Sequence, residues 1–260
     1  MQMHHIRRGS GTPLLLIHGL GGSWRSWDRI IDALAAEREV IAVDLPGFGE
    51  TPPLPGEVSI ATLADAIASF LDDNHLTGID AVGSSMGARL VLELARRGVV
   101  GSVVSLDPGG FWHGWEQRFF RISVDLSYRL VKVLQPVLPF VTGNPVTRTA
   151  LLIQFSARPW KLPAAVALTE LRSFGVSRSF LPLLETLVNG PDQQGIPAGT
   201  AEHPIVIGWG RRDRVCIPRQ AKRAAERFPD ARVQWFEHSG HFPQWDAPEE
   251  TIRVILEATG

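Results

Sequence analysis

Short apolar runs alternate with longer amphipathic stretches along this chain, and this alternation constrains the fold more than any other feature. The runs are apolar on both faces, as strands buried inside a parallel sheet are, and they cover 13–17, 40–43, 81–82, 103–106, 204–207 and 233–236. The amphipathic stretches carry apolar residues at helical spacing and cover 60–71, 88–97, 219–227 and 248–257. Such alternation predicts an α/β fold with a doubly wound, mostly parallel sheet.

The middle of the chain breaks this pattern. No strand-like run occurs between Trp112 and about Gly199, where prolines interrupt helical stretches instead. The sequence therefore predicts a helical cap at 112–199, inserted into a core formed by 1–111 and 200–260. Because ligands bind at the carboxyl ends of the strands in open α/β sheets, we expect this cap to lie over the site.

The bulk composition excludes several classes of protein. Among 260 residues, 26 basic and 27 acidic side chains leave a formal net charge of −1, so no excess charge favours nucleic acid or an anionic membrane. Cys216 is the single cysteine, so no intrachain disulfide can form. No run approaches the roughly 20 apolar residues of a membrane-spanning helix, and the first residues do not match a secretory signal. We expect a cytoplasmic protein with no integral membrane segment, no nucleic-acid partner and an oligomeric state left open.

The pentapeptide Gly83-Ser84-Ser85-Met86-Gly87 has the pattern G-x-S-x-G. It follows an apolar run and precedes the helical stretch 88–97. A strand, a sharp turn and a helix are the context in which this motif presents a serine, because the turn lifts the hydroxyl above the sheet. The flanking glycines carry no Cβ and let helix and strand pass closely. Ser85 is therefore the candidate nucleophile.

A serine hydroxyl needs a base to take its proton, and the base needs a third group to orient it. His241 follows the last strand-like run, and Asp213 follows the run before it. The order Ser85, Asp213, His241 is one of the known chain orders of a catalytic triad. Asp107 also follows a strand-like run and is the alternative acid. We favour Asp213 because its strand is expected next to that of the histidine.

The Gly-rich turn His18-Gly19-Leu20-Gly21-Gly22 follows the first clear strand. Such a turn can direct a backbone N–H at a reacting carbonyl oxygen, and we assign this donor to Leu20. The second donor of the oxyanion hole is the N–H of Met86, at the start of a helix. We expect His18 to brace the turn and Asp44 to hold the following Pro46–Gly49 turn. No metal-ligand spacing is present, so we expect neither a metal nor an organic cofactor.

With these landmarks in place, the chain resembles the α/β-hydrolase superfamily over nearly its whole length. The resemblance rests on Leu16-Ile17-His18-Gly19, Asp44-Leu45-Pro46-Gly47-Phe48-Gly49, Gly83-Ser84-Ser85-Met86-Gly87, Gly210-Arg211-Arg212-Asp213 and Gly240-His241. It implies a serine hydrolase, because related dehalogenases and epoxide hydrolases carry aspartate at the position of Ser85.

Two groups of the superfamily are similar to this chain. One comprises small carboxylesterases and lipases with a helical cap; the other comprises serine C–C bond hydrolases that cleave vinylogous diketone acids. The second group typically has Gly-Asn-Ser-Met-Gly-Gly and a tryptophan after the histidine, where this chain has Ser84, Ala88 and Phe242. We therefore expect a small hydrophobic ester of a short- to medium-chain acid as substrate. The alternatives are C–C hydrolysis and, from another class, a non-catalytic ligand receptor on this fold.

The cap sequence is rich in aromatic residues and arginines. We expect most of the aromatic rings to pack in the cap core and a few to line an apolar pocket; they are Trp112, Trp115, Phe119, Phe120, Tyr128, Phe140, Phe155, Trp160 and Phe174. For the apolar segment 126–141, we favour core packing over contact with lipid. We expect no cap arginine to reach Ser85, and a buried, unreactive Cys216.

Overall fold

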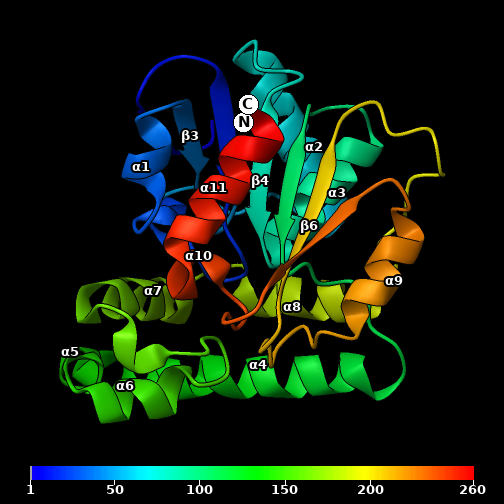
Figure 1. Ribbon diagram of the computed structural model, residues 1–260. Coiled ribbons are helices and arrows are strands. Elements are labelled where there is room, and N and C mark those ends of the chain that lie inside the picture. The colour runs from blue at the N-terminus through cyan, green and yellow to red at the C-terminus, as the bar shows by residue number, and fades with distance from the viewer. Residues whose placement is uncertain (1) are drawn as a thin grey trace.

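A seven-stranded sheet forms the centre of the molecule in the computed structural model, which describes residues 2–260 (Figure 1). The strands lie in the order β1-β3-β2-β4-β5-β6-β7. Strands β2 to β7 are parallel, and β1 pairs antiparallel with β3. Their bounds are β1 His5–Arg8, β2 Pro13–Ile17, β3 Glu39–Val43, β4 Asp80–Ser84, β5 Val103–Leu106, β6 Ile205–Gly210 and β7 Arg232–Phe236. The predicted mostly parallel sheet is confirmed.

Strand β1 is the one strand that the apolar pattern did not predict. It pairs only with β3 at the sheet edge, and its residues His5 to Arg8 are half-buried or exposed. Because an edge strand that is only half-buried needs no continuous apolar run, it leaves little hydropathy signal.

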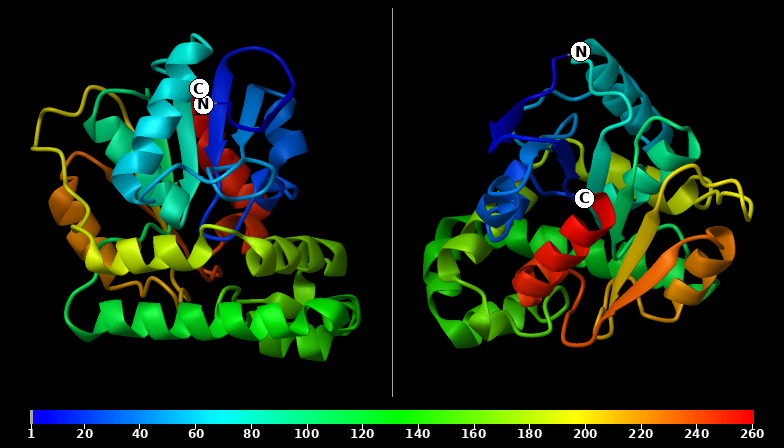
Figure 2. Two further views of the ribbon diagram at one scale, coloured as in Figure 1. Left: turned by 180° about the vertical axis from the view of Figure 1, so that it is seen from behind. Right: turned by 45° about the horizontal axis from the view of Figure 1, so that its top comes forward.

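Helices cover both faces of the sheet, as the doubly wound prediction requires (Figures 1 and 2). Side chains alternate along a strand, so Leu14 and Leu16 pack into one apolar cluster while Leu15 and Ile17 pack into the other. Helices α1 (Ile31–Ala35) and α11 (Pro248–Thr259) contribute to the first cluster. The second takes in α2 (Ile60–Asp73), α3 (Met86–Arg96) and α9 (Gln220–Arg227).

Between β5 and β6 the chain forms helices only, within the described residues 2–260. They are α4 Trp115–Leu134, α5 Leu138–Gly143, α6 Pro145–Leu152, α7 Ala164–Val176 and α8 Phe180–Asn189, with short 3₁₀ turns at Gln135–Val137 and Pro159–Lys161. We call α4 to α8 the cap helices. They form a layer across one end of the strands, with α4 beside α8 (Figure 2). The cap boundaries 112 and 199 stay a prediction.

The outer face of α4 is more apolar than the sequence led us to expect. Trp112, Phe120, Tyr128, Phe155 and Phe174 pack in the interior as predicted, whereas Trp115, Phe119, Phe140 and Trp160 are exposed. Core packing of 126–141 holds for Tyr128, Val131 and Leu138 and is wrong for Leu126, Leu130, Val133, Val137 and Phe140, which are exposed. For Leu126, Leu130 and Val133 the reason is that α4 packs on α7 and α8 along one side only. Val137 and Phe140 lie beyond α4, in the 3₁₀ turn and in α5. No helix of residues 2–260 is both long and apolar enough to cross a membrane.

Candidate active site

Ser85 occupies a sharp turn between β4 and α3. Its backbone has φ 56° and ψ −113°, a region that a residue with a Cβ rarely adopts and that costs energy of order 1–3 kcal/mol. The neighbouring glycines make the turn possible. A Cβ on Gly83 would lie 2.1 Å from the Gly87 carbonyl oxygen, and one on Gly87 would lie 2.2 Å from that of Ile17. The turn thus lifts the Ser85 hydroxyl off the end of the sheet.

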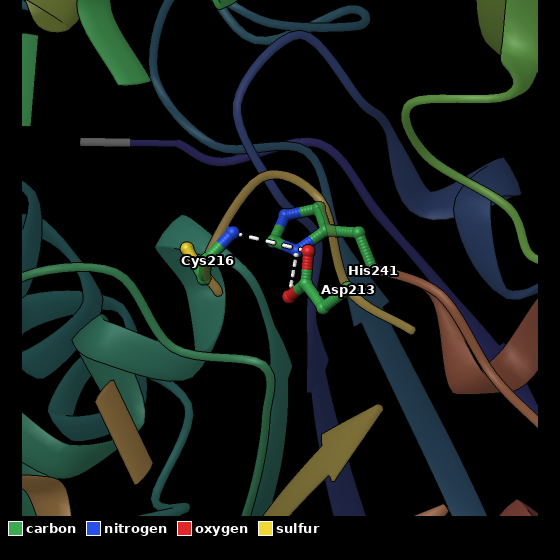
Figure 3. A group of neighbouring side chains, drawn as sticks. All are labelled: Asp213, Cys216 and His241. Carbon is green, nitrogen blue, oxygen red and sulfur yellow. Dashed lines mark hydrogen bonds and ion pairs between the residues drawn. The ribbon is translucent and has the colours of Figure 1, made fainter. Parts of the chain in front are cut away.

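Three side chains from separate loops form one hydrogen-bonded chain. The Nε2 atom of His241 lies 2.8 Å from the Ser85 Oγ, and its Nδ1 lies 2.8 Å from the Asp213 Oδ2. The other carboxylate oxygen of Asp213 accepts from the backbone N–H groups of Val215 and Cys216 at 2.7 and 3.0 Å. Figure 3 shows Asp213 held between the His241 ring and Cys216. His241 and Asp213 are both buried, so this geometry is shielded from water.

Asp107, the alternative acid, lies close to Asp213 but has no contact with His241. Its Oδ1 accepts the Gly210 backbone N–H at 2.8 Å, and its Oδ2 has no partner among residues 2–260. Complete burial, reinforced by the neighbouring Asp213 carboxylate, raises the pKa of Asp107 well above its usual range. Burial therefore favours the neutral form of the Asp107 carboxyl.

The Gly-rich turn lies directly against Ser85. The Gly22 N–H donates to the Gly19 carbonyl at 3.1 Å, which closes a tight turn. The Leu20 N–H takes no part in this hydrogen bond. A Cβ on Gly19 would lie 3.1 Å from the Ser85 Cβ. Met86 is the first residue of α3, where helical N–H groups have no partner within the helix. Both predicted oxyanion donors thus flank Ser85.

His18 and Asp44 have the structural contacts that we expected of them. The buried His18 ring meets the Gly19 carbonyl at 2.7 Å through Nδ1 and accepts the Leu45 N–H at 3.0 Å through Nε2. Burial lowers the pKa of His18, which keeps the ring neutral. Asp44 accepts the N–H groups of Trp24 and Glu50 at 2.7 and 3.0 Å and so closes the turn after β3.

A cavity of about 700 Å³, including its open mouth, lies between Ser85, His241 and the cap helices. Its apolar wall is formed by Leu20, Phe120, Val124, Leu152, Phe155, Leu171, Phe174, Val215, Phe242 and Trp245. Its polar residues besides the triad members are Ser26, Ser84, Glu170 and Gln244. No arginine or lysine of the described chain lines it, in agreement with our expectation for the cap arginines.

Two features of this site were not identified from the sequence. The His241 N–H donates to the carbonyl of Phe155, a cap residue, and no sequence pattern indicates such a contact. Glu170 faces the cavity and could have been found. It is the single charge in the stretch Ala164–Leu171, at the helical spacing that puts it beside Ala167 and Phe174.

Asp213, Cys216 and His241 also form a group whose potential metal ligands lie within 4.8 Å of one another (Figure 3). The Asp213 and His241 atoms already bond to each other. Burial raises the pKa of the Cys216 thiol well above its usual range, which disfavours the thiolate that binds metals. The group therefore does not fit a metal site.

The sequence of residues 14–254 matches the alpha/beta hydrolase family. The chain belongs to this family. Its similarity to individual curated relatives is low. It is 26% identical over 249 residues to the dihydrolipoyllysine-residue acetyltransferase component of the acetoin cleaving system of Pseudomonas putida, covering 95% of this chain but 63% of that protein. It is also 26% identical to the 2-hydroxy-6-oxo-2,4-heptadienoate hydrolase of a Pseudomonas putida strain, covering 95% of this chain and 88% of the relative.

Among solved structures, a thermophilic esterase from Thermogutta terrifontis is similar in fold to this hydrolase. The TM-score is 0.76 at 20% sequence identity, covering 98% of this chain and 92% of the esterase. At that identity the likeness supports the alpha/beta hydrolase fold and leaves the substrate class open.

Proposed function

We propose that this hydrolase is a carboxylesterase-type serine hydrolase that cleaves small hydrophobic esters of short- to medium-chain acids. The observation that carries the proposal is the hydrogen-bonded chain from Ser85 through His241 to Asp213, with 2.8 Å at each link. Distances of this kind are what a serine nucleophile, its base and an orienting acid need. Ser85 and His241 line a cavity with a largely apolar wall, in which the acyl group of a substrate can be buried away from water.

In this mechanism, His241 takes the Ser85 proton on Nε2 as the Ser85 Oγ attacks the ester carbonyl. The N–H groups of Leu20 and Met86 stabilise the oxyanion that forms, and one such donor typically contributes about 10²–10³ in kcat. His241 then gives the proton to the leaving alcohol, and an acyl-enzyme remains. Water, deprotonated by His241, then attacks the acyl-enzyme. As the bond to the Ser85 Oγ breaks, His241 gives this proton to Ser85 and the acid is released.

We assign the orienting acid to Asp213 rather than Asp107. Asp213 bonds to the Nδ1 of His241 and receives two backbone N–H donors, which hold its carboxyl group in place. An imidazolium at His241 therefore faces a carboxylate. Burial raises the pKa of Asp107, and its carboxyl accepts the Gly210 N–H and makes no hydrogen bond to the His241 ring.

Ester cleavage is favoured over C–C hydrolysis by the charge of the cavity. A vinylogous diketone acid brings a carboxylate, and a site for it needs a cation, ideally an arginine. None of the described residues that line the cavity is an arginine or lysine, and one of them is a glutamate. The similarity to a 2-hydroxy-6-oxo-2,4-heptadienoate hydrolase keeps C–C hydrolysis as the second candidate. No observation favours a non-catalytic receptor. A cytoplasmic location is part of the proposal.

The proposal is tested with a panel of p-nitrophenyl esters run beside a vinylogous diketone acid. We expect turnover of the esters, with the highest kcat/KM for apolar acyl chains. Faster cleavage of the diketone acid than of any simple ester would replace the proposal by C–C hydrolysis. A single slow turnover with retained ligand would indicate a receptor.

A further inference from the structure

Glu170 places a carboxyl group in the wall of the catalytic cavity, on the inner side of α7. Its Oε2 accepts a hydrogen bond from the Ser26 hydroxyl at 3.1 Å. Ser26 lies in the 3₁₀ turn Trp24–Trp27, next to the oxyanion turn, since a Cβ on Gly22 would lie 2.6 Å from its Oγ. The Glu170–Ser26 pair therefore links the cap to the loop that holds Leu20. The proposed hydrolysis does not use this pair.

The Glu170 carboxyl has no counter-charge. No ion pair within 4 Å involves it in the described chain. Glu185, another carboxylate of the cap helices, is paired with Arg121. Glu170 is half-buried, and its side chain lines the cavity. Burial, with a smaller contribution from the nearby Asp28, raises the pKa of Glu170 to about 8 in spite of the Ser26 hydrogen bond. Near neutral pH the group is therefore an uncharged acid.

Two more polar atoms in the cavity wall lack a partner. Gln244 donates to the Ser84 hydroxyl at 3.0 Å, but its Oε1 has no partner among residues 2–260. The indole N–H of Trp245 has none either. Both residues are at least nine-tenths buried and both line the cavity. Buried polar atoms left without partners are costly, so the cavity wall is not purely apolar.

We propose that Glu170 and Ser26 bind an uncharged hydroxyl group of the substrate, so that the enzyme selects hydroxylated esters over plain alkyl esters. The inference rests on the proposed ester hydrolysis and adds a polar determinant to it. A hydroxyl both donates and accepts. The uncharged Glu170 carboxyl offers it an O–H donor and an acceptor, and the Ser26 oxygen, whose proton is donated to Glu170, offers a further acceptor.

Other polar groups fit this pair less well. A carboxylate on the substrate would face an acid with no cation nearby, which costs binding energy. An ammonium group donates only, and it would have to ionise Glu170 inside an apolar wall, against the effect of burial. A hydroxyl needs no change of charge on either side. The same reasoning separates this site from that of a C–C hydrolase.

The inference can be tested by binding, without turnover. Three ketones serve as probes, in which a CH₂ replaces the ester oxygen and the chain ends in an ethyl, a hydroxymethyl or an aminomethyl group. Each tail is placed on either side of the carbonyl. Affinities are measured by calorimetry at pH 7 for the wild type, Glu170→Gln, Glu170→Leu and the matched control Glu185→Gln, a cap glutamate on the surface.

We expect the wild type and Glu185→Gln to bind the hydroxymethyl ketone about tenfold more tightly than the ethyl ketone, as one to two net hydrogen bonds allow. Glu170→Gln keeps an acceptor and a donor and should retain most of this ratio. Glu170→Leu should abolish it. Thermal melts report whether either variant is folded, and if Glu170→Leu is not, Ser26→Ala takes its place with a reduced ratio expected.

Several outcomes would overturn the inference. They are equal affinity for the ethyl and hydroxymethyl ketones in the wild type, a preference that survives Glu170→Leu, and a preference for the aminomethyl ketone that Glu170→Gln removes. The last would identify a site for cations. Ester turnover and fluorophosphonate labelling are measured on the same protein. Their failure would reject the proposed hydrolysis, while the ratio of ketone affinities would still decide the hydroxyl site.

Discussion

The backbone N–H of His241 donates to the carbonyl oxygen of Phe155 at 2.8 Å, so a cap segment holds the loop of the proposed base. Asp246 strengthens this junction. Its Oδ2 accepts the N–H groups of Ala157 and Gly240 at 2.8 and 2.7 Å, one on each side of the contact. The position of the His241 ring therefore depends on the cap as well as on the sheet.

Asp246→Ala should lower kcat by about 10- to 100-fold, because a small misplacement of a catalytic group is costly. Fluorophosphonate labelling of Ser85 should be slower but still complete, since the nucleophile is intact. Stopped-flow labelling and steady-state kinetics measure both effects. Asp230→Ala, which removes an exposed carboxylate that accepts the Gly199 N–H, is the control and should keep wild-type rates. Equal rates in the two variants would contradict the positioning role of Asp246.

Ser85→Ala should abolish labelling by a fluorophosphonate and lower kcat by at least about 10³-fold, because nucleophile and base act as a unit. Mass spectrometry of the labelled protein and ester turnover provide the measurements. Ser84→Ala changes the adjacent hydroxyl and should still be labelled. Labelling that persists in folded Ser85→Ala would move the nucleophile elsewhere.

Asp213→Asn and Asp107→Asn should separate the two candidate acids. Asp213→Asn should cost about 10⁴ in kcat, since the amide favours the wrong histidine tautomer. Asp107→Asn should cost less than about tenfold, because an amide closely replaces a carboxylic acid that is already neutral. Steady-state kinetics of both variants give the ranking, and the reverse order would assign the acid to Asp107.

Glu170→Gln should change how stability depends on pH. The folded protein keeps the Glu170 proton up to a pKa of about 8, whereas the unfolded chain releases it near pH 4.3. The folded state thus binds more protons between these values, so its stability contribution is lost as the pH rises from about 4.3 to about 8. Glutamine does not titrate. Thermal melts from pH 5 to pH 9 should therefore show Glu170→Gln gaining on the wild type, and a constant difference would refute the raised pKa.

Gly87→Ala should destabilise the fold strongly, because its Cβ would lie 2.2 Å from the Ile17 carbonyl oxygen and 2.5 Å from that of His18. Overpacking against backbone typically costs about 1–3 kcal/mol or more. Gly143→Ala is the matched control, since a Cβ there meets no atom within 4 Å. Urea denaturation gives both free energies of unfolding. A Gly87→Ala variant as stable as Gly143→Ala would mean that the turn can relax.

The sequence by itself determined the fold class and the candidate triad. Buried parallel strands must be apolar on both faces, so β2 to β7 are visible as runs such as 13–17 and 204–207. Catalytic loops follow these strands, so Ser85, Asp213 and His241 could be named from their places after predicted strands. The strained turn at Ser85 has a local cause, the two glycines, and local causes are visible in sequence.

Only the tertiary structure shows which of Asp213 and Asp107 contacts His241. Both follow a strand and both are buried, and what separates them is a 2.8 Å contact with a ring far along the chain. The exposed apolar face of α4 and the cavity-facing position of Glu170 have the same origin. Helical spacing groups residues on a face, but which face meets another element depends on how α4 and α7 pack. Burial and charge state follow from that packing, so no local pattern contains them.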